Sequence, residues 1–201
     1  MKRYPRAVAN QRPSSRQFQI LLVIVVTFLV LLNVVRLPDL LAHWMGYSGQ
    51  LALFAVDMTF NYTPAQVYAL LSAYGNEGRH AYAAMLILFD IVFPFLYGSF
   101  LSVGLRLVVQ HTRLSLRLQS IVGGLPYVAS TADWLENVCI LAMLFSYPSQ
   151  LTAIASIANL MTMTKFLVAA ICLSGLLLGG LVLLVQRIFF PRKARLEGRP
   201  Q

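Results

Sequence analysis

Three acidic residues lie where a membrane-like sequence should hold none. Asp90, Asp133 and Glu136 each fall within a long apolar stretch of the 201-residue chain. An ionisable side chain in the hydrocarbon part of a membrane costs a few kcal/mol, so such residues face the interior of a bundle and have partners. Carboxylates held close together cannot all be ionised, so at least one of them would carry a proton. The three residues are therefore candidates for proton transfer, in catalysis or in coupled transport.

Helical spacing brings further polar side chains alongside these acids. Tyr97 falls on the same helix face as Asp90, and Asn137 falls on the same face as Asp133 and Glu136. Asp90 and Glu136 each lie about nine residues from the outer end of their predicted helix, a depth of roughly 13 Å at 1.5 Å per residue. The two helices are sequential and antiparallel, so we expect Asp90 and Glu136 to meet at one level, with Asp133 a turn deeper.

Two basic residues are placed to join these acids from the outer side. Lys165 lies near the outer end of the last apolar stretch, where a long side chain can snorkel, and Arg79 precedes the second stretch. We therefore expect an acidic cluster beneath a basic rim. The candidate ligand-pocket residues are Arg79, Asp90, Tyr97, Asp133, Glu136, Asn137 and Lys165.

The cluster allows two interpretations, a structural polar network or a functional pocket. A metal centre is disfavoured, because carboxylates without a nearby histidine suit only hard cations. The sequence holds no G-x-S-x-G, Walker, H-E-x-x-H or G-x-G-x-x-G motif, so hydrolase, nucleotide-binding and zinc-protease functions have no support. We expect no cofactor, and the sequence leaves open whether the protein is an enzyme.

The composition identifies the elements that must hold these residues. The chain is 58% hydrophobic and 11% charged, with a mean hydropathy of +0.70, whereas a soluble domain carries about 25% charged residues. We predict an all-α fold, a four-helix transmembrane bundle in a membrane domain over 18–188. Pro94 should kink the second span, and a short helix near 150–158 should precede the fourth. The predicted spans are 20–37, 81–107, 119–145 and 160–186.

The basic residues of the chain are concentrated in the two tails and in one loop. The net charge is +9, and most basic residues lie in the predicted tails 1–17 and 189–201 and in the loop 108–118. The positive-inside rule then predicts a multi-pass protein of the cell (inner) membrane, with both termini and that loop in the cytoplasm. The same distribution argues against nucleic-acid binding.

The connection 38–79 is predicted to form a roof on the outer side. Pro38 should end the first span. Thr63-Pro64-Ala65-Gln66 has the pattern of a capping box with proline in the first turn, followed by an amphipathic helix. The apolar stretch 51–60, which contains Asp57, is too short to span a membrane and is expected to be re-entrant or interfacial.

Three motifs resemble known membrane proteins. Tyr74-Gly75-x-x-Gly78-Arg79-x-x-Tyr82, Asp90-x-x-x-Pro94-x-x-Tyr97 and Asp133-x-x-Glu136-Asn137 resemble a family of small four-helix bacterial membrane proteins, over about residues 57–148. This resemblance implies a fold and brings no activity.

The chain is also weakly similar to the EXPERA group, which includes the sterol Δ8-Δ7 isomerase and the sigma-2 receptor. That similarity implies an acid on the second span, Asp90, and one on the third, Asp133 or Glu136. The chain lacks the paired Glu and Thr pattern of that group, so no catalytic role is transferred.

We therefore predict an integral membrane protein with an outward-leaning carboxylate pocket that binds a small or lipidic ligand. Membrane lipid is the other expected partner, and an oligomer is possible. Three further classes stay open. The protein could be an intramembrane acid/base enzyme acting on a lipid or isoprenoid, a proton-linked transporter subunit that must oligomerise, or a structural or assembly protein.

Overall fold

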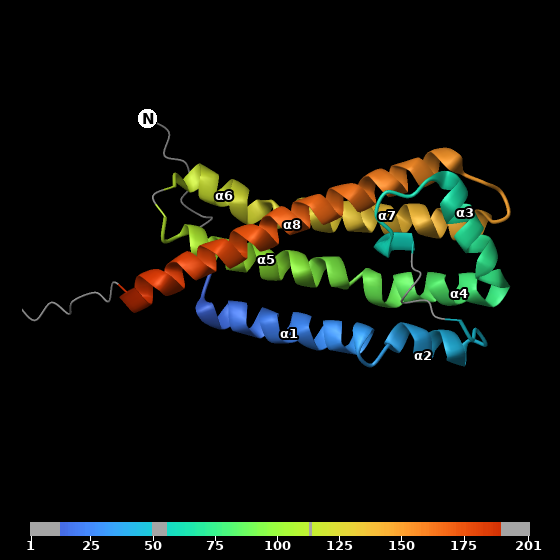
Figure 1. The fold of residues 1–201 in the computed structure, drawn as a ribbon, viewed down its shortest axis with the longest axis horizontal. Helices are drawn as coiled ribbons and strands as arrows, with labels where there is room; N and C mark the ends of the chain where they lie inside the picture. Colours follow the sequence, from blue (N-terminus) through green and yellow to red (C-terminus); the bar gives the residue numbers. More distant parts are fainter. Residues whose placement is uncertain (1–12, 50–55, 113, 190–201) are drawn as a thin grey trace, which may run out of the picture.

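Most of the described part of the chain is helical. The computed structural model describes residues 13–49, 56–112 and 114–189, and no strand occurs within these ranges. The predicted basic tails lie for the most part outside the described residues. Within the described ranges, four helical rods are long and apolar enough to cross a membrane, which confirms the predicted all-α four-helix bundle (Figure 1). The rods are Ser15–Asn33, Gly75–Val109, Leu116–Ser146 and Thr152–Phe189.

The first rod, α1 (Ser15–Asn33), begins at a capping box. The Ser14 hydroxyl accepts from the Gln17 backbone, and the Gln17 side chain accepts from the Ser14 backbone. The rod therefore starts five residues before the start of the predicted span 20–37, and it ends four residues before the end of that span. The prediction that Pro38 ends this rod is wrong. A left-handed Arg36, with φ 58°, separates the rod from α2 (Leu37–Trp44), and the proline lies in the first turn of α2, where no N–H is needed.

The connection between the first two rods covers one end of the bundle. The predicted capping box is present at Thr63 and Gln66 and begins α3 (Pro64–Ala73). Figure 1 shows α3 lying across the ends of the long helices. The predicted re-entrant stretch is described only from residue 56, where a single 3-10 turn, η1 (Val56–Met58), buries Val56 and Asp57 and leaves Met58 exposed.

The second rod is interrupted. It consists of α4 (Gly75–Met85), a π-helical turn η2 (Leu86–Asp90), and α5 (Phe93–Val109). A kink was predicted at Pro94, and the helix breaks just before it, at residues 91–92. Because proline has no N–H, the carbonyl of Asp90 four residues earlier loses its helical partner.

Side chains of the third rod satisfy the carbonyls around this break. Asn137 Nδ2 donates to Asp90 O at 3.2 Å, and Trp134 Nε1 donates to Ile91 O at 2.9 Å. Ser130 Oγ donates to Pro94 O at 2.6 Å. Residues 130, 134 and 137 lie one turn apart on one face of the helix, so a single face of the third rod holds the broken second rod in register.

The remaining rods pack closely along each other. The third comprises α6 (Leu116–Gly124) and α7 (Pro126–Ser146), and the fourth is one continuous helix, α8 (Thr152–Phe189). The separate short helix predicted near 150–158 is wrong, because residues 152–158 form the first turns of α8, which contains no proline and continues to Phe189. Fully buried alanines of α7 and α8 allow their backbones to approach; they are Ala129, Ala155 and Ala158.

A methyl group at Gly98 should disrupt the contact between α5 and α7. A Cβ at this position would lie 2.1 Å from Ser130 Oγ, whereas a Cβ at Gly180 of α8 would meet nothing within 4 Å. We expect Gly98→Ala to lower the free energy of unfolding by about 1–3 kcal/mol. Gly180→Ala should leave it unchanged or slightly raised, because alanine favours helices. Melting temperatures of both variants in one detergent test this, and equal values would contradict the contact.

Candidate functional site

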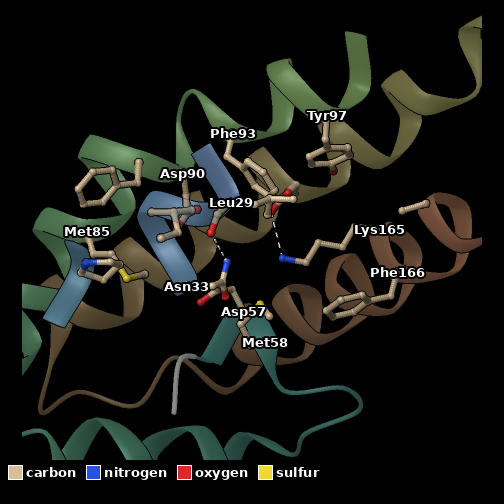
Figure 2. Close-up of a pocket in the computed structure, with 15 residues that line it drawn as sticks. Leu29, Asn33, Asp57, Met58, Met85, Asp90, Phe93, Tyr97, Lys165 and Phe166 are labelled. Carbon is tan, nitrogen blue, oxygen red and sulfur yellow. Dashed lines mark hydrogen bonds and ion pairs between the residues drawn. The ribbon is translucent and has the colours of Figure 1, made fainter. Parts of the chain in front are cut away.

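A cavity of about 390 Å³ lies where the interrupted second rod faces α1 and α8 (Figure 2). Its walls are mostly apolar and include three phenylalanines. Three carboxylates and one lysine face the same space. The residues that line it are Leu29, Leu32, Asn33, Pro38, Asp57, Met58, Met85, Phe89, Asp90, Phe93, Tyr97, Asp133, Lys165, Phe166 and Ala169.

Lys165 of α8 is held by two carboxylates of α7. Its Nζ lies 3.0 Å from Asp133 Oδ1 and 2.7 Å from Glu136 Oε2. The other carboxylate oxygen of Glu136 accepts from Thr162 Oγ1 at 2.5 Å, and the Glu136 residue is fully buried. A buried ion pair is tolerated when each charge is paired and further hydrogen bonds support it. At Glu136 one carboxylate oxygen faces the ammonium and the other accepts from Thr162. The structure therefore brings together the three predicted residues Asp133, Glu136 and Lys165.

Asp90 has a different environment from the one predicted. The π-helical turn presents it to the cavity, and its carboxylate has no hydrogen-bond or ion-pair partner among the described residues. The expected meeting with Glu136 does not occur, because Glu136 points to α8 instead. The two acids are close in level, but Glu136 faces Lys165 of α8 whereas Asp90 of η2 faces the cavity. The described hydrogen bond between Asp90 and α7 is made by the backbone carbonyl of Asp90, which accepts from Asn137.

Asp57 is a cavity residue that the sequence analysis did not assign to the site. Its residue exposure is 7%, and its Oδ1 accepts from Tyr82 Oη at 2.6 Å. The segment that carries it is also fixed to α8, because the Tyr62 backbone donates to Asn159 Oδ1 at 3.0 Å. Burial raises the pKa of the Tyr62 phenol, which keeps that side chain neutral beside the cluster. An aspartate within the short apolar stretch 51–60 was the one available signal.

Arg79 does not join the cluster, so the predicted basic rim is wrong in this respect. Its Nη1 donates to the carbonyl of Leu71 at 3.2 Å, and its guanidinium lies 4.0 Å above the ring of Tyr147. Arg79 thus binds the last turn of α3, where free carbonyls favour a cation.

Tyr97 and Asn137 support the site from two sides. Tyr97 lines the cavity, and its phenol lies beside Asp133. Asn137 does not line the cavity; it fixes the helix break through Asp90 O, and its own Oδ1 is buried without a hydrogen bond among the described residues. No group of three or more His, Cys, Asp or Glu within the described ranges is arranged to hold a metal ion.

Comparison with known proteins adds no assignment. No protein-family model, no curated protein and no solved structure matches this chain. The two resemblances carried by the sequence motifs therefore stay predictions. The function has to be argued from the cavity and from the charges that face it.

The paired and unpaired charges should respond differently to substitution. Lys165→Met leaves Asp133 and Glu136 buried without a cation, and we expect it to lower the free energy of unfolding by about 3–5 kcal/mol. Asp90→Asn removes no described side-chain interaction, so it should change stability by less than about 1 kcal/mol. Thermal unfolding of both variants in nanodiscs measures the difference. A larger loss for Asp90→Asn than for Lys165→Met would contradict the division into paired and unpaired groups.

Proposed function

We propose that this chain is a multi-pass protein of the cell (inner) membrane that binds a small or lipidic ligand in the acidic cavity. The cavity itself carries this proposal. At about 390 Å³ it lies within the range of small-molecule sites, which are mostly apolar with a few polar groups that fix orientation. Because Asp133, Glu136 and Lys165 bind one another, Asp57 and Asp90 are the charged groups of the described lining that are left to face a ligand.

The distribution of arginines supports cytoplasmic termini. Arg16 begins α1, Arg106 ends α5, Arg117 begins α6 and Arg187 lies in the last turn of α8. All four lie at the end of the bundle opposite α3 (Figure 1). Under the positive-inside rule this end faces the cytoplasm, and the end that carries α3 faces outward.

Charged residues at the two ends of the rods also support a level for the cavity. The 19 residues of α1, which has Arg16 in its first turn and is followed by Arg36, span roughly 28 Å, and the distance from Lys165 to Arg187 along α8 is roughly 33 Å, at 1.5 Å per residue. A hydrocarbon core is about 30 Å thick. The cavity, which is lined by Lys165 and by Asn33 at the end of α1, then lies near the outer boundary of that core, which is shallower than the depth expected from helix lengths alone.

The topology can be tested with reporter fusions. A green fluorescent protein fused to the C-terminus should fluoresce, because it folds in the cytoplasm. Alkaline phosphatase should be inactive at the same position and active when fused after Ser149, in the connection between α7 and α8. The reverse pattern would contradict the proposed orientation.

The ligand proposal can be tested by filling the cavity. Ala169 of α8 lines it, and the adjacent Ala170 is exposed on the outside of the bundle. Wild-type protein and both variants would be isolated in native-membrane nanodiscs, extracted with organic solvent and compared by mass spectrometry. We expect a molecule that co-purifies with the wild type and with Ala170→Phe, and that falls at least tenfold in Ala169→Phe. Equal recovery from all three proteins, or no enriched molecule in any, would overturn the proposal.

A further inference from the structure

Carboxylates outnumber basic groups around the cavity. Asp57, Asp90 and Asp133 face it, and Lys165 is the single basic side chain among the described residues that line it. The ammonium of Lys165 is already bound by Asp133 and Glu136. Asp57 receives a hydrogen bond from the Tyr82 phenol, which brings no charge. Two carboxylates at one cavity are therefore left without a cation among the described residues.

We propose that the ligand of this cavity carries one protonated amine on an apolar body, with the amine bound by Asp57 and Asp90. This inference rests on the proposed function, because it names the class of ligand for the same site. Figure 2 shows both acids facing the space between α1 and the helix break. An ammonium group supplies positive charge and several N–H donors, whereas carboxylates only accept hydrogen bonds.

The cavity walls favour an organic cation over an inorganic one. The described acids are not arranged as a metal site. Phe89, Phe93 and Phe166 line the same space, and aromatic rings can stabilise a cation while they bury an alkyl or aryl body. A hydrated inorganic ion would leave these rings without an apolar partner.

The same charges disfavour an anionic ligand. A phosphate or carboxylate group in the cavity would meet Asp57, Asp90 and Asp133, and like charges at short distance repel strongly where water is scarce. Lys165 offers little compensation, because two protein carboxylates already bind it. An amine that lacks a phosphate therefore fits the site better than the headgroup of a phospholipid.

Dodecylamine and dodecanol form a matched pair of probes for this inference, because they share a chain and differ in the charged group. Binding of radiolabelled dodecylamine would be measured with full-length protein in phosphatidylcholine nanodiscs, as the excess over empty nanodiscs. We expect unlabelled dodecylamine to displace it, and dodecanol to displace it at least tenfold less well. Asp90→Asn should weaken binding at least tenfold. Glu77→Gln, a change at an exposed acid of α4 outside the cavity, should leave binding unchanged.

Asp90 is a better position for the variant than Asp57, because the Asp57 side chain accepts from Tyr82 and the Asp90 side chain binds no other described group. Loss of binding in Asp90→Asn would therefore not result from loss of the fold, and the melting temperature of the variant checks this. Equal displacement by dodecanol, unchanged binding in Asp90→Asn, or no binding of either probe would overturn the amine inference. The extraction experiment with Ala169→Phe decides the broader proposal separately. Displacement by water-soluble 2-phenylethylamine would assign a soluble amine, and displacement by dodecylamine alone would assign a membrane-dissolved one; either result supports the inference.

Discussion

The arrangement of the bundle depends on one backbone carbonyl. Pro94 leaves Asp90 O without its helical hydrogen bond, and in lipid such a group must find a partner inside the protein. Asn137 supplies that partner, and the same face of α7 binds the next carbonyls through Trp134 and Ser130. These bonds fix the register of α5 on α7. They also hold the π-helical turn that directs the Asp90 side chain towards the cavity.

The adjacent face of α7 contacts α8 through an ion-pair network. Asp133 and Glu136 point to α8 and bind Lys165 there, so one helix connects the broken rod to the fourth rod at the same level. The space that remains on the other side of the break is bounded by α1, which buries only Val25 fully among its residues. Phe28 of α1 stacks on Phe93, which lines this space. Leu29, Leu32 and Asn33 of α1 form one wall of the cavity.

Helix periodicity predicted the parts of the site that lie within single rods. Asp133 and Glu136 are one turn apart, and a lysine at the matching level of the next apolar stretch is the natural partner, so this cluster follows from sequence. The path of the connection 38–79 does not follow from periodicity. For that reason Asp57 was not assigned to the site and Arg79 was assigned wrongly. The helix break was expected at Pro94, but its consequence for the side chain of Asp90 required the positions of Asn137 and Trp134.

The two acids without a cation are harder to explain by stability than the three paired groups. Within the network of Lys165, Asp133 and Glu136, both carboxylates share the one ammonium, so each of them has an opposite charge beside it. Replacing Asp90 by an apolar residue would remove a desolvated carboxylate without leaving any described group unpaired, and a carboxylate near a membrane core is costly to keep. A protein that needed these helices only for packing would gain by losing that acid. The proposed ligand therefore explains the position of Asp90 better than the groups that surround it do.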